Sequence, residues 1–299
     1  KFAKDNWQYI TQTVGKRTAL DYEQYLEQHI LPHFGRMNVE DIDWRDVQAF
    51  YDKNSDRSFS TVHKFRIVLS RLMQIAVGDG LIIVDPTRDK RLSYSRKKSV
   101  RSVPDIDTYK KLMSSVPFLE EHHERLYMAI LGYTGLRKGE ILALKWNDVS
   151  FKENLIYVRR SIEIARTSKT NQGAIKSPKT EAGVRTVPIA EPLKKILINH
   201  QTTDEYVITD QKAGKPVHNG SAFETMWRHI SSQIDLGPYT SHSFRHALCS
   251  TLLSSGVDVK TAQTILGHSQ PSTTLNIYAH AIPNKVQEAG SIFAQKMSG

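Results

Sequence analysis

Four residues near the C-terminal end of the chain have types and spacings that suit chemistry on a phosphate. His242 and Arg245 are three residues apart, so a helix would present an imidazole and a guanidinium on one face. His268 follows in a Leu-Gly-His segment, where the glycine is typical of a helix end, and Tyr278 comes ten residues later. The set offers cationic groups for an anion and a phenol as a nucleophile.

The order and spacing of these motifs resemble those of the tyrosine recombinases, the family of phage and transposon integrases. The family signature is His-x-x-Arg, then Leu-Gly-His, then a nucleophilic tyrosine. This chain reads His242-Ser-Phe-Arg245, Leu266-Gly-His268 and Asn276-Ile-Tyr278. The resemblance implies that Tyr278 attacks a DNA phosphate to form a 3′-phosphotyrosyl link, and that His268 donates a hydrogen bond to a phosphate oxygen. One departure is Phe244, where the family usually has Leu, and Phe keeps that position apolar.

A second segment, Tyr133-Thr-Gly-Leu-Arg137-Lys-Gly-Glu140, resembles the first arginine motif of the same family. Arg137 and Arg245 together would clamp the non-bridging oxygens of a phosphate with paired hydrogen bonds and stabilise its transition state. Glu140 is expected to orient an arginine or His242 rather than to react. A phenol with a reference pKa of about 10 needs a proton acceptor at neutral pH, and His242 is the candidate acceptor for Tyr278.

Lys179 lies in a Ser-Pro-Lys-Thr segment ahead of an expected strand. It resembles the lysine that the family carries on a β-hairpin loop, where it protonates the departing 5′-oxygen as a general acid. Lys176 is the rival for this role. The same hairpin bears other basic residues that suit surface contacts with phosphates, namely Arg159, Arg160, Arg166, Lys169 and Arg185.

Neither a metal nor a nucleotide cofactor is expected. His242 and His246 are spaced like a zinc pair, but Ser243 replaces the glutamate of a zinc-binding helix and no third ligand is evident. No glycine-rich phosphate loop occurs. The resemblance implies that the energy of the broken phosphodiester is kept in the phosphotyrosine bond.

The composition favours a polyanionic partner. Among the 299 residues, Lys and Arg number 41 and Asp and Glu 31, which gives a formal charge of +10. A merely basic soluble protein would have the same balance. The single cysteine, Cys249, excludes a disulfide framework and is expected to be a buried, inert thiol. No apolar run approaches the ~18 residues of a membrane span and no signal peptide opens the chain, so we expect a cytoplasmic protein. The resemblance implies that it is associated with a bacterial nucleoid. The chain begins with Lys1 rather than Met, as expected of a truncated or processed protein.

We expect a mainly α-helical chain with a small β-sheet, divided into two domains. Residues 1–88 are expected to be helical and 89–102 to form a basic linker. The resemblance implies that 1–88 is a core-type DNA-binding domain and that 103–299 is an α+β recombinase domain, with a C-terminal tail from about 282. The tail has apolar residues near helical spacing and fits packing on a neighbouring protomer or on its own domain equally well.

Periodicity predicts the individual elements. An apolar stripe from Phe65 to Val77 predicts a long helix ended by Gly78 and Gly80, and an earlier helix is expected to stop near Pro32. Short strands are expected at 155–158 and 184–189. Further helices are expected at 105–115, 121–132, 138–145, 191–200, 221–233, 241–254, 258–266 and 273–279, the helix from 241 being capped by Thr240 or Ser241.

Seven of the residues from Arg88 to Arg101 are basic and one is acidic, without apolar periodicity. A solvated charge run is the ordinary interpretation. A basic strap that lies on phosphates between two DNA-binding domains is the interpretation we favour, because it accounts for the rest of the chain. The residues expected to contact DNA are Arg96, Lys97, Lys98, Arg101 and Lys176.

The leading hypothesis is a site-specific recombinase of a mobile element, acting on double-stranded DNA attachment sites. The resemblance implies a homotetramer on two DNA sites, with an accessory DNA-bending or directionality factor as a further partner and no membrane. Two alternatives stay open. The segment Gly256–Gly267 has the form of a turn and short helix and suits a helix-turn-helix regulator, and a type IB topoisomerase would share the chemistry.

Overall fold

The structure is a computed structural model. It describes residues 1–94, 102–163, 174–176, 184–210, 215–217, 220–268, 270, 274–275, 295 and 297. The chain divides into two compact units, Lys1–Val100 and Arg101–Gly299, each with its own hydrophobic core. Each unit is considered by itself.

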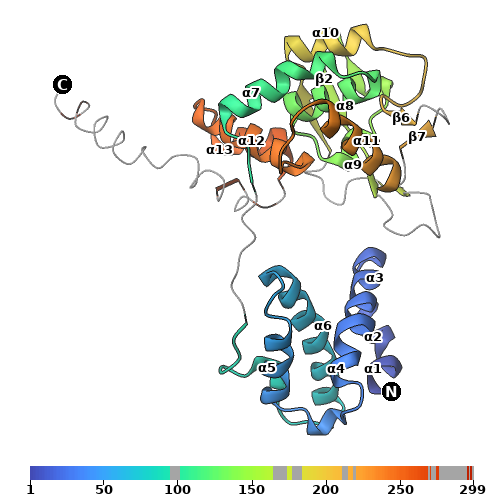
Figure 1. The fold of residues 1–299 in the computed structure, drawn as a ribbon, viewed down its shortest axis with the longest axis vertical. Coiled ribbons are helices and arrows are strands. Elements are labelled where there is room, and N and C mark those ends of the chain that lie inside the picture. Colours follow the sequence, from blue (N-terminus) through green and yellow to red (C-terminus); the bar gives the residue numbers. More distant parts are fainter. Residues whose placement is uncertain are drawn as a thin grey trace. The chain divides into compact units, whose positions relative to one another are not determined.

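The regular elements in the described part of the N-terminal unit are all helices. Figure 1 shows α3, η1 and α4 following one another as a single helical column. The helices are α1 (Phe2–Asp5), α2 (Trp7–Thr11), α3 (Lys16–Tyr25), the π-helix η1 (Leu26–Ile30), α4 (Leu31–Phe34), η2 (Val39–Asp41), α5 (Trp44–Lys53), α6 (Phe59–Gly78) and η3 (Pro86–Arg88).

Helix α6 forms the centre of this unit because its caps and its apolar stripe agree. The Ser58 hydroxyl accepts a hydrogen bond from the Thr61 backbone N–H at 3.3 Å, which caps the first turn. Phe65, Val68 and Leu69 on its inner face are buried in the same core as Phe50 of α5. The helix ends at Gly78, and Gly80 follows with a φ of 73°.

The helical column ends at Phe34, two residues beyond the Pro32 near which the helix was expected to stop. The Leu31 N–H bonds to the Leu26 carbonyl, and this widened turn accommodates the ring of Pro32, which has no N–H to donate. The unit also extends beyond residue 88, because the Ser93 N–H donates to Gln48 Oε1 at 2.9 Å and Tyr94 packs against the core.

The C-terminal unit combines helices with short strands. Its helical elements are α7 (Ile106–Ser115), η4 (Val116–Phe118), α8 (His122–Thr134), α9 (Lys138–Leu142), η5 (Trp146–Asp148), α10 (Glu191–Asn199), α11 (Gly220–Gln233), α12 (Ser241–Ser254) and α13 (Val259–Leu266). Its strands are β1 (Val149–Ser150), β2 (Leu155–Val158), β3 (Ser161–Glu163), β4 (Ala174–Lys176), β5 (Arg185–Pro188), β6 (Thr209–Asp210) and β7 (Lys215–Pro216).

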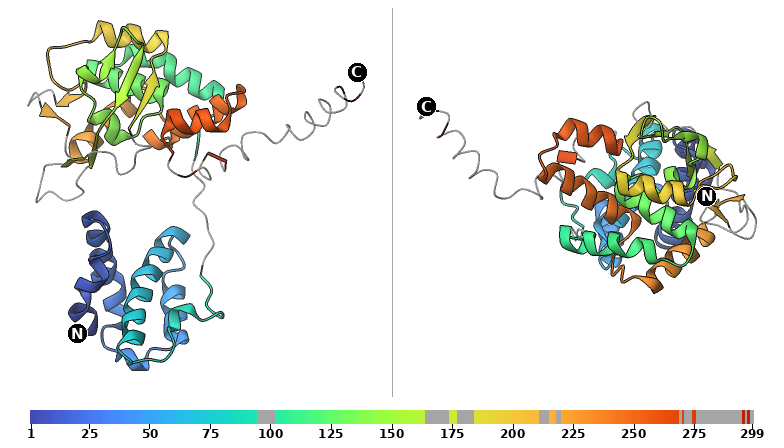
Figure 2. Two further views of the ribbon diagram at one scale, coloured as in Figure 1. Left: turned by 180° about the vertical axis from the view of Figure 1, so that it is seen from behind. Right: turned by 90° about the horizontal axis from the view of Figure 1, so that it is seen from above.

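A three-stranded antiparallel sheet, in the order β1-β2-β5, anchors the unit. The left view of Figure 2 shows these strands from the side opposite to that of Figure 1. Alternation along β5 directs Arg185 and Val187 to the buried side and Thr186 to solvent. Val187 and Ile156 join α8 and α10 in one core, so the sheet holds Arg185 at the edge of that core.

The expected helices and strands of this unit mostly lie within two residues of those observed. The helix expected at 138–145 is an exception and ends at Leu142, because Leu144 and Lys145 pair with the segment around Tyr206. The Val207 N–H donates to the Leu144 carbonyl at 2.9 Å, and Lys145 and Tyr206 form a β-bridge. Of the helix expected at 273–279, the structure describes Thr274 and Leu275, both helical.

Candidate active site

A tight turn between α8 and α9 places Arg137. Gly135 ends α8 with a φ of 62°, and its N–H donates to the Leu131 carbonyl at 2.9 Å. A Cβ at Gly135 would lie 2.8 Å from Leu266 Cδ2, so the turn also needs glycine for its close approach to α13. Arg137 follows as the residue that caps α9.

Glu140 fixes Arg137 from the first turn of α9. One Glu140 oxygen accepts the Arg137 backbone N–H at 2.8 Å, and the other accepts its guanidinium at 2.9 Å. Burial by itself raises the pKa of Glu140, but the Arg185 guanidinium and then Arg137 outweigh burial and hold that pKa below its usual value. The carboxylate is therefore ionised and orients an arginine.

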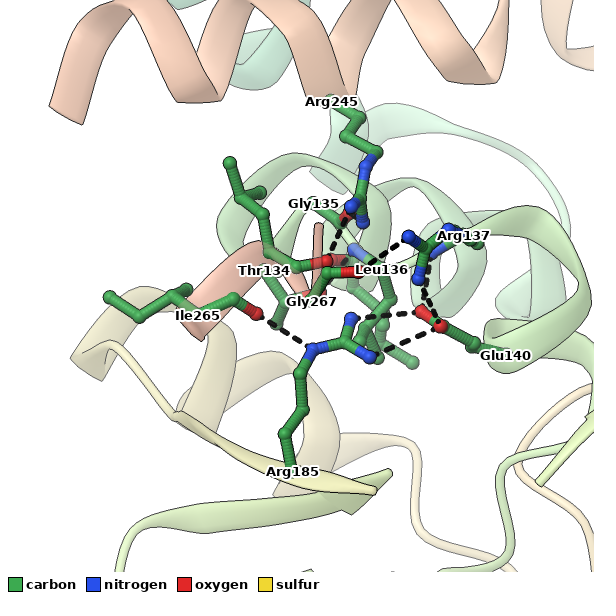
Figure 3. A network of polar contacts seen from close by, with 11 residues as sticks. Thr134, Gly135, Leu136, Arg137, Glu140, Arg185, Arg245, Ile265 and Gly267 are labelled. Atoms are coloured by element: carbon green, nitrogen blue, oxygen red, sulfur yellow. Dashed lines mark hydrogen bonds and ion pairs between the residues drawn. The ribbon is translucent and has the colours of Figure 1, made fainter. Parts of the chain in front are cut away.

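Arg245 reaches the same place from α12. Thr240 caps this helix through the Ser243 N–H. Arg245 is 2% exposed, and its guanidinium donates to the Gly135 carbonyl at 2.7 Å and to the Leu266 carbonyl. Burial, and then the nearby Arg137, lower the pKa of Arg245 to about 9, so it keeps its charge at neutral pH. Arg137 donates to the adjacent Gly267 carbonyl at 2.5 Å (Figure 3).

His268 comes directly after the glycine that ends α13. Its Nδ1 lies 2.8 Å from the Thr274 hydroxyl, and the Gln263 amide donates to its carbonyl at 2.9 Å. Burial, and then Arg245 and Arg137, lower the pKa of His268 to about 3. The ring is neutral at physiological pH and can donate one hydrogen bond without adding charge.

His242 lies on the exposed first turn of α12, one turn before Arg245. Its ring is 5.0 Å from that of His246. Both histidines are near enough to contribute to the lowered pKa of His268. Two arginines and two histidines from distant parts of the chain thus share one region, which suits an anion with more than one negative oxygen.

The family comparison decides what this arrangement is. The model described as "Phage integrase family" matches residues 105–285, and that described as "Phage integrase, N-terminal SAM-like domain" matches residues 2–54. The chain belongs to the phage integrase family.

Two curated relatives give the same assignment. The ICEBs1 integrase of Bacillus subtilis is 26% identical over 278 residues, which cover 88% of this chain and 73% of the relative. The "Tyrosine recombinase XerC-like" protein of Caldanaerobacter subterraneus is 26% identical over 279 residues, which cover 85% of this chain and 71% of the relative. This integrase is a tyrosine recombinase, and the relatives support site-specific recombination of a mobile element.

Solved structures confirm the predicted fold class. The Tn1549 transposon integrase, in complex with transposon right end DNA, matches with a TM-score of 0.79 at 21% identity and 98% coverage of both chains. A lambda integrase tetramer bound to a Holliday junction matches with a TM-score of 0.65 at 19% identity, covering 91% of this chain and 75% of the other. The mainly helical recombinase fold with a small sheet is therefore shared.

Other predicted residues of this integrase lie beyond the residues that the structure describes. Lys179 and Tyr278 are among them, and of Lys176 only the backbone is described. The expected DNA contacts Arg96, Lys97, Lys98 and Arg101 also lie outside the described residues. Their roles stay predictions.

Three further observations concern the suggested helix-turn-helix, a metal site and membrane-spanning helices. Helix α13, the core of the suggested helix-turn-helix, has the carbonyls at its C-terminal end bound by arginines of the site. Within the described residues, no group of three or more His, Cys, Asp or Glu side chains is arranged to hold a metal ion. No helix in the described part of the chain has the length and apolar character needed to cross a membrane.

The buried position of Arg185 was not predicted from the sequence, which grouped this residue with basic residues at the surface. Arg185 is 8% exposed and donates to both oxygens of Glu140, at 3.1 and 2.9 Å. The sequence feature that could have predicted this burial is the alternation of side chains along the strand, which puts Arg185 on the same face as the apolar Val187. Arg160 was also misread, because it pairs with the buried Asp148 at 2.7 Å.

Proposed function

We propose that this recombinase cuts and rejoins DNA through a covalent bond to Tyr278. The phenolic oxygen attacks the phosphorus of a phosphodiester, the bond from phosphorus to the 5′-oxygen breaks, and a 3′-phosphotyrosyl link and a free 5′-hydroxyl result. Attack by the 5′-hydroxyl of the partner strand reverses the step and releases the tyrosine. The chemistry consumes no metal or nucleotide, because the phosphodiester is exchanged rather than hydrolysed.

The convergence of Arg137, Arg245 and His268 carries this proposal. These residues are far apart in the chain, and all three lie at the C-terminal end of α13. Two guanidinium groups would bind the non-bridging oxygens of the scissile phosphate, and a neutral imidazole would add one hydrogen bond. The stabilisation grows as negative charge builds up in the transition state.

Proton transfer is assigned to two further residues. His242 would accept the proton of Tyr278, and its exposed position on the first turn of α12 leaves it open to a substrate. Lys179 would donate a proton to the departing 5′-oxygen, as the match of its segment to the family implies. Lys176 remains the alternative donor.

We further propose that four protomers assemble on two duplex attachment sites, which strand exchange between both duplexes requires. The similarity to the lambda integrase tetramer supports this arrangement. The basic linker, with Arg96, Lys97, Lys98 and Arg101, would lie on phosphates and make binding fall steeply with salt. An accessory DNA-bending or directionality factor fits the same scheme, and action on DNA places the protein at the bacterial nucleoid.

A nicked suicide duplex that carries the attachment site tests the proposal. The protein should form a covalent DNA adduct, Tyr278→Phe should form none, and Tyr239→Phe should serve as a matched control with full adduct. An adduct that persists in Tyr278→Phe would overturn the assignment of the nucleophile. No adduct with any of the three proteins would favour a DNA-binding regulator.

Two additional measurements separate the finer assignments. Synapsis of two sites with strand exchange is expected, whereas relaxation of supercoils without exchange would indicate a topoisomerase. A substrate with sulfur at the bridging 5′-position has a leaving group that needs no protonation, so it should restore cleavage by Lys179→Ala. Failure of this rescue, together with rescue of Lys176→Ala, would transfer the general-acid role to Lys176.

A further inference from the structure

Three successive carbonyls at the C-terminal end of α13 each accept a hydrogen bond from a different arginine (Figure 3). Arg185 Nε donates to the Ile265 carbonyl at 2.9 Å, Arg245 donates to the next carbonyl, and Arg137 to the one after. The last carbonyls of a helix have no partner within the helix and carry partial negative charge. Arginines from β5, α12 and the α8–α9 turn therefore meet at one helix end.

Arg185 is linked to Arg137 through a shared carboxylate and to Arg245 through the end of α13. It donates to both oxygens of Glu140, and Glu140 in turn holds the backbone and guanidinium of Arg137. Its third contact, to Ile265, fixes the helix end on which Arg245 and His268 depend. Because the Arg185 side chain is buried, it supports the other residues of the site and does not present its charge at the surface.

Gly267 leaves the space that this guanidinium occupies. A Cβ at Gly267 would lie 2.7 Å from Arg185 Cζ and 2.8 Å from its Nε. The glycine also has a φ of 65°, which a side chain disfavours. The turn before His268 and the position of Arg185 are therefore mutually dependent.

Charge adds to this geometric role. Glu140 is one carboxylate among three guanidinium groups, of which that of Arg137 is partly exposed, so the cluster keeps a surplus of two positive charges. Without Arg185, the Glu140 carboxylate would be offset by Arg137 alone, and the positive potential available to a phosphate would fall. Arg185 thus balances Glu140 and leaves Arg137 and Arg245 for the substrate.

We propose that Arg185 is a positioning residue that holds Arg137, Arg245 and the α13 end in the geometry that binds the scissile phosphate. This role rests on the proposed function. Arg185 follows Lys179 by six residues in the sequence, so β5 connects the hairpin segment of the expected general acid to the arginine cluster. Arg185 itself makes no contact with DNA in this proposal.

The test compares Arg185→Lys with wild type and with Arg160→Lys. Arg160 is a matched control, because it pairs with a buried carboxylate in the same unit and its hydrogen bonds go to Asp148, not to α13. Lysine keeps the charge but lacks the planar fork that bridges Glu140 and Ile265. At saturating protein, single-turnover cleavage of the suicide duplex should fall about 10- to 100-fold in Arg185→Lys, the range for loss of a group that orients a reacting residue. DNA affinity and melting temperature should match those of Arg160→Lys, which should cleave like wild type.

A second substrate separates positioning from general structural damage. A methylphosphonate at the scissile position has no negative non-bridging oxygen, so the arginines stabilise less charge there. The defect of Arg185→Lys, relative to wild type, should be several-fold smaller on this substrate. If Arg185→Lys does not fold, Arg185→Gln, whose amide can still donate to the Glu140 carboxylate that Arg137 pairs, should show the same difference between substrates.

Equal defects on both substrates, or an undiminished rate in Arg185→Lys while wild type forms its adduct, would overturn the role of Arg185 alone. A loss of DNA affinity as large as the loss of rate would overturn it as well. Absence of a Tyr278-dependent adduct in wild type would contradict the proposed function and this role together.

Discussion

Two helices of this integrase are followed by a glycine with a left-handed backbone conformation, but the two helix ends have different roles. Helix α6 is followed by Gly80 and α13 by Gly267, both with a left-handed φ. At both ends, backbone N–H groups of the following residues bond back to the helix, with Leu81 donating to the Ala76 carbonyl at 2.9 Å and His268 to the Gln263 carbonyl at 3.1 Å. At α13, arginine side chains from three other elements take the last carbonyls.

The surroundings of the two glycines explain the difference. A Cβ at Gly80 would meet no atom within 4 Å, whereas a Cβ at Gly267 would meet the guanidinium of Arg185. The α6 end is a local stop signal at the exposed end of a helix that packs in a structural core. The α13 end gathers buried cations next to His268, where we propose that the scissile phosphate binds. The side chains that contact the last carbonyls of a glycine-terminated helix therefore decide whether its end has a functional role.

The largest expected effect is the loss of Arg245. Arg245→Lys removes the fork that bridges Gly135 and Leu266, and single-turnover cleavage should fall about 10²- to 10³-fold, as for loss of one donor to a transition-state oxygen. Arg71→Lys is the matched control, because Arg71 also donates to a backbone carbonyl, that of Ile10, but in the N-terminal unit. Equal losses in the two variants would show that the α13 end has no special role.

The next effect concerns the glycine itself. Gly267→Ala should lower the cleavage rate about 10- to 100-fold, because its Cβ displaces Arg185 and strains the turn before His268. DNA affinity, measured by equilibrium binding, should change little. A cleavage rate like that of wild type would contradict the coupling between the turn and the arginines.

A pH effect on stability should come from His268. Its pKa is about 3 in the folded protein and near 6.5 when unfolded, so between these values the unfolded state binds more protons. The stability contributed by the neutral ring is full above pH 6.5 and is lost as the pH falls toward 3. Urea unfolding at pH 7 and pH 4.5 should show a smaller acid-induced loss in His268→Gln than in wild type. The same loss in both proteins would indicate that this ring is charged in the folded state.

The smallest effect is expected at the other helix end. Gly80→Ala meets no neighbouring atom and should cost only the strain of its positive φ, about 1–2 kcal/mol in the unfolding of the N-terminal unit. Cleavage by the folded protein should be unchanged. A loss of cleavage comparable to that of Gly267→Ala would remove the distinction between the two ends.

Local patterns in the sequence were sufficient for most of the fold and for part of the site. Capping residues and periodicity located helices such as that from Ser241 to Ser254, and motif spacing selected Arg137, Arg245 and His268. The burial of Arg185 was not predicted, because its partners are distant in sequence and its charge favoured a surface position. The π-turn at Leu26–Ile30, just before Pro32, was not predicted, because it has no clear sequence signal.

The most direct test of the account is to map the covalent adduct in three proteins by peptide mass spectrometry. Wild type and Arg71→Lys, trapped on the suicide duplex, should carry a nucleotide remnant on the peptide that contains Tyr278. Arg245→Lys should carry the same remnant in a far smaller amount at equal time. A remnant on another tyrosine, such as Tyr239 or Tyr157, or equal amounts of adduct in all three proteins, would contradict the claim that the arginine-bound end of α13 activates the phosphate for Tyr278.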